Sequence, residues 1–188
     1  TKVDVVAPGR DFAAVRMIYE SIGETRKSFG YLGTMVSGPL YDAEVHSLDG
    51  HFVNADGRVV VDGQFIYGGR EQEKGYGGLI DMTYSKSSNL SHIIELEYMD
   101  EDIDFNDLGF LARNNYARLR YVLSYNQLDM GPGLSNYRTT LIAEQQYGLD
   151  EGLVTDSGLY WRSSLFLPRR NTLRMGVGYM PERFEDID

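Results

Sequence analysis

Apolar and charged residues alternate one by one along much of this chain, and that alternation limits the folds open to it. Residues 115–125 show it most plainly, because Leu119 and Tyr121 alternate there with Arg118 and Arg120. A period of two is typical of a β-strand with one face in apolar surroundings. The pattern recurs, and it fits poorly only in the third of ten predicted strands, at residues 12–20, 28–36, 43–53, 58–68, 75–85, 89–99, 115–125, 136–147, 154–167 and 171–179.

Composition supports an all-β class. The 188 residues include 21 glycines and 14 tyrosines but only five prolines, and helical periodicity is essentially absent. Aromatic residues favour strands, and glycine permits the tight connections between them. We therefore predict one all-β domain that covers residues 1–188.

The two faces of the predicted strands differ in charge. The apolar face is predicted to carry no Asp, Glu, Lys or Arg, whereas the other face mixes arginine with acids and lacks lysine. Arginine forms bidentate pairs with carboxylates, which suits an enclosed lumen in which charges must be paired. Glu95 and Glu97 would face Arg118 and Arg120 across neighbouring strands. The predicted lumen charge network comprises Arg16, Asp62, Asp81, Glu95, Glu97, Arg118, Arg120, Arg138, Glu144, Arg162 and Arg174.

These faces favour an antiparallel up-and-down transmembrane β-barrel in a bacterial outer membrane, with lipid against the apolar face. Tyrosines fall at the C-terminal ends of predicted strands, and neighbouring strands run in opposite directions, so the tyrosines would collect at both rims. Aromatic girdles of membrane barrels lie there, although tyrosine is also a common strand residue. The tyrosines concerned are Tyr19, Tyr67, Tyr84, Tyr98, Tyr125, Tyr147 and Tyr179.

The connections between predicted strands alternate in length. Those at 54–57, 86–88 and 168–170 are short, and those at 69–74 and 100–114 are longer. Short turns of bacterial barrels normally lie in the periplasm, so both ends of this chain would lie outside the cell. That arrangement predicts about ten strands of a larger barrel. The connection at 126–135 is long for a periplasmic turn, which keeps a closed ten-stranded barrel open as an alternative.

Charge and composition exclude several classes of function. The formal net charge of -10 and the pI near 4.7 argue against a nucleic-acid partner, which would require a basic surface. The absence of cysteine excludes disulfides, thiolate metal sites and cysteine nucleophiles.

A cluster of acidic residues gives the sequence its one candidate for a metal site, formed by Asp100, Asp102, Asp104 and Asp107. Oxygen ligands at alternating positions suit Ca²⁺, but the spacing is not that of an EF-hand. Phe105 replaces the glycine that the EF-hand turn requires, and Leu111 replaces its bidentate glutamate. Loosely bound Ca²⁺ and a solvated acidic loop both fit the cluster, and no other cofactor is expected.

The sequence offers little for catalysis. His46 and His51 lie on the irregular third strand, and His92 lies on the apolar face near a strand start. No Gly-x-Ser-x-Gly or comparable nucleophile motif is present. We assign no catalytic residue and expect no catalytic activity in this segment.

The stretch from Asp104 to Tyr116, Asp-Phe-Asn-Asp-Leu-Gly-Phe-Leu-Ala-Arg-Asn-Asn-Tyr, leads into the strand with Arg118 and Arg120. It resembles the barrel domain of Gram-negative surface proteins in which a family-9-type carbohydrate-binding module precedes an outer-membrane β-barrel. The order of the Val15-Arg16, Gly33 and Asp49-Gly50 strands before this loop is similar too. The resemblance implies a membrane anchor or passage domain, with carbohydrate as a partner through a module that this segment lacks.

Two other functions remain open on the sequence. In a soluble lipocalin-like barrel or sandwich, the apolar face would line the interior and bind a small apolar ligand, and the charged face would meet water. A hydrolase with its site at the rim would draw on His92 or Asp81. The charged lumen of a membrane barrel would either line a channel or fill the interior with ion pairs.

Overall fold

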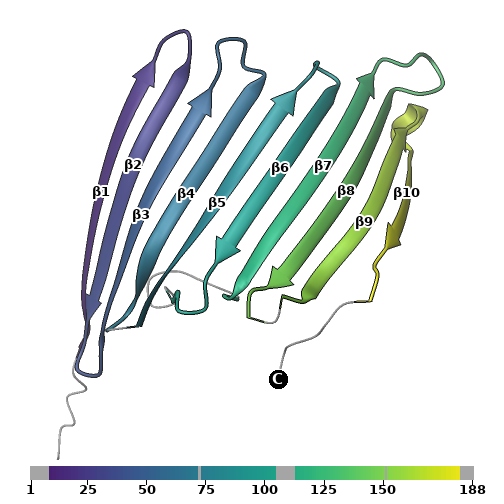
Figure 1. The fold of residues 1–188 in the computed structure, drawn as a ribbon. Helices are drawn as coiled ribbons and strands as arrows, with labels where there is room; N and C mark the ends of the chain where they lie inside the picture. The colour runs from purple at the N-terminus through teal and green to yellow at the C-terminus, as the bar shows by residue number, and fades with distance from the viewer. Residues whose placement is uncertain (1–8, 72, 105–112, 151, 183–188) are drawn as a thin grey trace, which may run out of the picture.

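The computed structural model describes residues 9–71, 73–104, 113–150 and 152–182. In these residues the chain forms ten strands and η1, a short 3-10 turn at Pro168–Arg170 (Figure 1). No helix in them is long and apolar enough to span a membrane. The strands are β1 (Asp11–Ile22), β2 (Arg26–Ser37), β3 (Asp42–Val53), β4 (Val59–Arg70), β5 (Glu73–Ser85), β6 (Leu90–Met99), β7 (Tyr116–Leu128), β8 (Asn136–Gly148), β9 (Val154–Phe166) and β10 (Thr172–Tyr179).

The ten strands form one sheet in which each strand pairs antiparallel with the next along the chain. This confirms the predicted all-β, up-and-down arrangement. The sheet is open: β1 and β10 are its edges, and no strand among the described residues pairs with their outer sides. The sheet curves, so β1 and β10 are seen nearly edge-on in Figure 1 while β4 to β8 are seen face-on.

Strand β3 is more regular than its sequence suggests. It pairs over its whole length with β2, and from Ala43 to Val53 with β4. Its sequence fits the alternation poorly because His46 and Glu44 point to one side while His51 and Asp49 point to the other. The flanking strands fix β3 in the sheet, and this pairing outweighs a weak local pattern.

The connection from β3 to β4 shows how the sequence makes a tight turn. Gly57 takes a left-handed backbone conformation with φ of 69°, and its N–H donates to the carbonyl of Asn54. The Asn54 side chain accepts a hydrogen bond from the N–H of Val59 at 3.0 Å. Glycine and asparagine are the residues that such a turn favours.

The connections lie at two ends of the sheet, which we call upper and lower as drawn in Figure 1. The prediction of a longer connection at 69–74 is wrong, because β4 and β5 extend to Arg70 and Glu73 and leave only residues 71 and 72 between them. The alternation in length is therefore weak, and the long connection at 100–115 stands out at the lower end. The upper connections are 23–25, 54–58, 86–89, 129–135 and 167–171, and the lower ones are 38–41, 71–72, 100–115 and 149–153.

One face of the sheet, here called the apolar face, is uncovered. Its large side chains are about half exposed, at 43–51% for Leu48, Phe65, Ile80, Leu96, Leu119 and Leu159. The opposite face, here called the polar face, carries the charged side chains described below. The small buried core of Ile66, Met99 and Ile103 lies on the polar face at the lower end.

The prediction that the apolar face carries no charge is wrong at the strand ends. Glu44, inside the predicted third strand, lies on the apolar face and forms an ion pair with Lys74 of β5 across Gly69. Among the described strand residues, the charges on this face lie within three positions of a strand end, at Asp11, Lys27, Asp42, Glu44 and Lys74. The central part of the face is free of charge in all ten strands.

Candidate functional site

The cross-strand register places all the residues of the predicted charge network on the polar face. Alternate residues of a strand share a face, and directly paired residues of neighbouring strands share it too. The pairing can be followed from Glu20 in β1 to Arg174 in β10 without a change of face. Lysine is absent from this face of the ten strands, as the sequence predicts.

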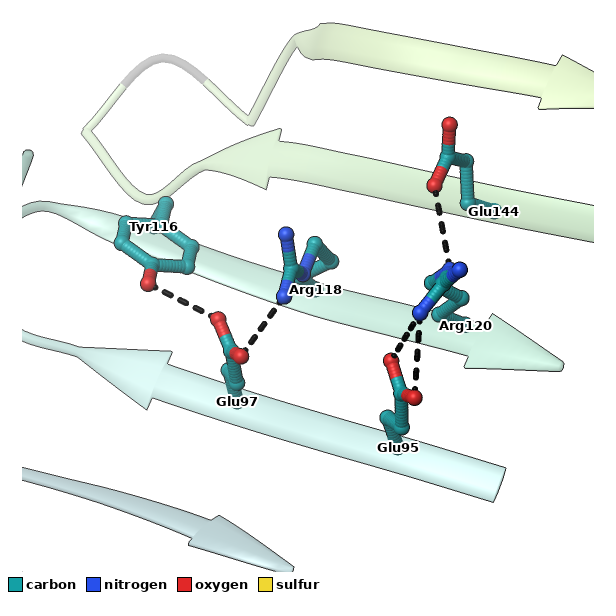
Figure 2. A network of polar contacts seen from close by, with 6 residues as sticks. All are labelled: Glu95, Glu97, Tyr116, Arg118, Arg120 and Glu144. Carbon is teal, nitrogen blue, oxygen red and sulfur yellow. Dashed lines mark hydrogen bonds and ion pairs between the residues drawn. The ribbon is translucent and has the colours of Figure 1, made fainter. Parts of the chain in front are cut away.

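A group of ion pairs lies at the centre of the polar face, on β6, β7 and β8 (Figure 2). Glu97 accepts hydrogen bonds from Arg118 at 2.6 Å and from the Tyr116 hydroxyl at 2.9 Å. Arg120 donates to both carboxylate oxygens of Glu95, at 2.7 and 3.0 Å. Its Nε lies 3.6 Å from a carboxylate oxygen of Glu144. The four charges of the predicted ladder therefore meet as expected, and Tyr116 joins them.

The row of side chains that contains Arg120 continues towards β3 with acids. Glu95 lies directly opposite Asp81 of β5, and Asp81 lies directly opposite Asp62 of β4. Asp62 in turn contacts Nδ1 of His51 at 2.6 Å. Three carboxylates thus occupy neighbouring positions between one arginine and one histidine. Like charges directly opposite each other are destabilising, so Asp81 is the least favourably placed member of the row.

Arg16 of β1 pairs with Asp49 of β3, which the sequence did not identify. The Arg16 side chain crosses over β2 at Gly30, and its Nη2 donates to the Asp49 carboxylate at 2.9 Å. A Cβ atom at Gly30 would lie 2.5 Å from Asp49 and 2.7 Å from Arg16. Asp49 lies directly opposite Gly30, and only the register of the sheet reveals this position.

Three arginines of the predicted network have no partner among the described residues. Arg138, Arg162 and Arg174 lie on the polar face of β8, β9 and β10, but no ion pair or side-chain hydrogen bond links them to a described residue. They are exposed, whereas the side chains of Glu95, Glu97 and Glu144 are only 23–24% exposed. The arginines of the polar face therefore fall into a paired group on β1, β2, β4 and β7 and an unpaired group on β8 to β10.

The lower end of the polar face is covered by residues 100–104, from the connection between β6 and β7. Ile103 is fully buried against Ile66 and Met99. The segment sits over Gly75 and Gly77, and a Cβ atom at Gly75 would overlap with the backbone nitrogen of Ile103. This contact explains why glycine is found at position 75. Residues 100–104 leave less of the polar face uncovered at its lower end.

The predicted acidic cluster holds this segment in place. Asp100 accepts hydrogen bonds from the backbone N–H groups of Ile103 at 2.9 Å and Tyr76 at 2.8 Å. Asp104 lies 3.2 Å from Nε of Arg70. Asp107 lies outside the described residues. Within the described parts of the chain, no group of three or more His, Asp or Glu side chains is placed to hold a metal ion.

The histidines lie apart from one another. His46 and His92 are on the apolar face, where each contacts a tyrosine hydroxyl, Tyr31 at 2.8 Å and Tyr121 at 2.7 Å. His51 is on the polar face beside Asp62. The segment Gly75–Gly78 lies inside β5, as the sequence predicts.

Nine tyrosines of the apolar face form two bands, and two others, Tyr31 and Tyr121, lie in the middle of their strands. Those towards the lower end include Tyr67 and Tyr76, which pair directly, and Tyr98, whose ring stacks on Tyr76 with centroids 5.7 Å apart. Glycines create shallow apolar hollows between the bands, one of about 420 Å³ over Gly78. The lower band is Tyr67, Tyr76, Tyr98, Tyr147 and Tyr179, and the upper band is Tyr19, Tyr84, Tyr125 and Tyr137.

Fold and faces together define this chain as an all-β protein built on an open, ten-stranded, up-and-down sheet with one apolar and one charged face. A family model described as a domain of unknown function, DUF5916, matches residues 30–187. The chain belongs to this family. Comparison with curated proteins and with solved structures gave no match.

Proposed function

We propose that this chain is part of an outer-membrane β-barrel that serves as the membrane anchor or passage domain of a bacterial surface protein that handles carbohydrate. The observation that carries the proposal is the uncovered apolar face. Its central side chains are about half exposed to solvent, and no charge interrupts them. A contiguous apolar surface of this kind marks an interaction site, and lipid is an occupant that matches its breadth across all ten strands.

Strand lengths support the proposal. A strand needs about 9–11 residues to cross the hydrocarbon core at a tilt of about 45°. Strands β1 to β9 have 10 to 13 residues each. The charge-free centre of the apolar face would then lie in the hydrocarbon, and the charged strand ends such as Glu44 and Lys74 would lie in the headgroup region.

The two tyrosine bands fit the same arrangement. Amphipathic rings favour the boundary between hydrocarbon and water, where the hydroxyl stays hydrated while the ring remains in apolar surroundings. The bands lie towards opposite ends of the sheet and bracket its charge-free centre. In the proposal they are the two girdles of the barrel.

The polar face would line the interior. Its central charges are partly shielded and paired, with arginine in place of lysine, as suits a confined space. Residues 100–104 cover the lower end of this face, with the Ile103 side chain buried beneath them, and would narrow the interior there. Both features favour an anchor with a filled interior, and passage through the barrel is the secondary role.

The link to carbohydrate comes from the resemblance to surface-protein barrels that follow a carbohydrate-binding module. The motif that carries this resemblance runs from Asp104 to Tyr116, and residues 105–112 of it lie outside the described part of the chain. Carbohydrate would be bound by that module and not by this sheet.

Detergent dependence tests the proposal. The chain should stay in the membrane fraction after salt and alkaline washes, require detergent for extraction, and migrate differently on a gel before and after heating. Free solubility with no heat-dependent shift would contradict the proposal. That result, together with binding of a small apolar ligand, would support a soluble lipocalin-like barrel instead.

A further inference from the structure

Five arginines gather at the upper end of β8, β9 and β10. Arg138, Arg162 and Arg174 lie on the polar face, and Arg169 and Arg170 lie in η1 directly above. Ser164 lies opposite both Arg138 and Arg174, and Arg162 is two residues away on the same strand. The three arginines on the sheet therefore occupy neighbouring positions around one serine.

This group has no acidic partner in the described residues. Elsewhere on the polar face arginine is paired, as Arg26 is with Glu20 at the upper end of β1 and β2. The acids of the same face on β8 and β9 are Glu144, which contacts Arg120, and Asp156. Six residues of strand separate Asp156 from Arg162, about 20 Å at the usual rise. In a chain of net charge -10, five arginines with no acidic partner among the described residues form a local patch of positive charge.

A row of hydroxyl groups leads to the arginines. Ser85, Ser91, Ser124 and Thr140 are directly paired from β5 to β8, and Thr140 is paired with Arg162 of β9. Side chains that both donate and accept hydrogen bonds thus cross four strands at the level of the guanidinium groups.

A polar hollow of about 450 Å³ lies beside this row, lined by Ser85, Ser91, Ser124 and Asn126 and, from the upper connection at 54–58, by the ion pair of Arg58 with Asp56. The side-chain oxygen of Asn126 is buried and has no hydrogen-bond partner. Buried acceptors are nearly always hydrogen-bonded, so this oxygen lacks a donor. Asn126 is directly paired with Arg138, so the hollow ends one strand away from the nearest arginine of the group.

We propose that the upper end of the polar face binds an anionic sugar, with its phosphate or carboxylate on Arg138, Arg162 and Arg174 and its hydroxyls along the hollow. Guanidinium groups bind these anions through bidentate, charge-assisted hydrogen bonds. Sugar hydroxyls complement the serine row that lines the hollow. The site goes beyond the proposed membrane role, because it requires only the polar face and not lipid on the other.

Calorimetric titration of the folded chain with glucose 6-phosphate, glucuronate, glucose and inorganic phosphate tests the site. We expect the two anionic sugars to bind more tightly than glucose or phosphate. Added salt should lower the affinity of the chain for the two anionic sugars. The triple variant R138Q/R162Q/R174Q should lower their affinity about tenfold or more. Arg26→Gln, which changes a paired arginine at the same end, should change it less than about twofold.

A second variant separates the two parts of the ligand. Ser124→Ala should lower the affinity for glucose 6-phosphate and leave the affinity for inorganic phosphate unchanged. The proposal is overturned if the triple variant binds the anionic sugars as the parent does, or if phosphate alone binds as tightly as glucose 6-phosphate. Circular dichroism of each variant verifies that it is folded. Membrane extraction of the parent chain is measured separately, so failure of this site would leave the anchor proposal standing.

Discussion

Asp62 and Asp81 lie directly opposite each other on β4 and β5, so two carboxylates of like charge form one cross-strand pair on the polar face. Asp62 has a compensating contact with His51 at 2.6 Å, whereas Asp81 has Glu95 as its other direct neighbour. The row therefore concentrates its repulsion on Asp81.

Asp81→Asn should stabilise the fold. An amide keeps the size of the side chain and removes its repulsion with Asp62 and Glu95, so we expect the free energy of unfolding to rise by about 0.5–1 kcal/mol. Chemical denaturation, followed by the fluorescence of the single tryptophan, Trp161, measures the change. Asp62→Asn is the matched control. It relieves the same repulsion but replaces the charged partner of His51 with a neutral amide, which weakens that contact, and it should leave stability almost unchanged. A destabilised Asp81→Asn variant would contradict the interpretation.

The two partners of the central ion pair should respond unequally to removal. Arg120→Gln leaves Glu95 and Glu144 without their cation, beside Asp81, and we expect it to lower the free energy of unfolding by about 1–2 kcal/mol. Glu95→Gln loses the same pair but also relieves repulsion with Asp81, so its effect should stay within about 0.5 kcal/mol. The same denaturation experiment measures both variants. Equal losses in free energy of unfolding would show that repulsion from Asp81 contributes nothing beyond the ion pair.

The predictable part of the site is the part that strict alternation governs. Glu95, Glu97, Arg118 and Arg120 could be placed opposite one another because β6 and β7 alternate cleanly, and a slip of one residue would put charges on the apolar face. Asp49 could not be recognised, since β3 carries polar residues on both faces and its partner Arg16 is two strands away.

Two further features depend on information that no local pattern carries. The burial of Ile103 follows from a loop that folds back over two glycines, and the sequence shows only an acidic connection there. The period of two that predicts the polar face holds for Arg138, Arg162 and Arg174 as it does for the paired arginines. Alternation fixes the face of a side chain, but only the register and the neighbouring residues decide whether an acid lies beside it.

Gly30→Ala should break the contact between Arg16 and Asp49 without disturbing the strand. The new methyl group would occupy the space through which Arg16 crosses β2, while alanine is otherwise accepted in a strand. We expect a lower Tm in the parent chain and no such loss in an Arg16→Gln background, where nothing crosses. Gly50→Ala on β3 is the control, because its nearest atom is 3.9 Å away. Equal losses from Gly30→Ala in both backgrounds would rule out a role for the crossing arginine.

The segment 100–104 should be released by two independent substitutions. Ile103→Ala removes the buried side chain that anchors it and should cost about 2–4 kcal/mol of local or global stability. Gly75→Ala should push the segment away, because the new Cβ would overlap with its backbone. Both variants should speed amide hydrogen exchange at Ile103, whose N–H donates to Asp100 in the parent. Gly63→Ala, with its nearest atom 3.8 Å away, should leave exchange unchanged. Unaltered exchange in Gly75→Ala would mean that the segment does not rest on β5.

Depth dependence along one strand gives the sharpest test of lipid on the apolar face. Ile80 lies at the centre of β5, and Tyr84 lies on the same face next to its upper end. In a bilayer, arginine costs about 2–4 kcal/mol at the midplane and about 0–1 kcal/mol near the interface. Ile80→Arg should therefore strongly reduce folding into lipid vesicles, and Tyr84→Arg should reduce it only slightly, as measured by heat-modifiable migration after refolding. Ile80 is 51% exposed in the open sheet, so a water-facing surface would accept arginine there with little loss. Equal folding of the two variants would exclude lipid from this face.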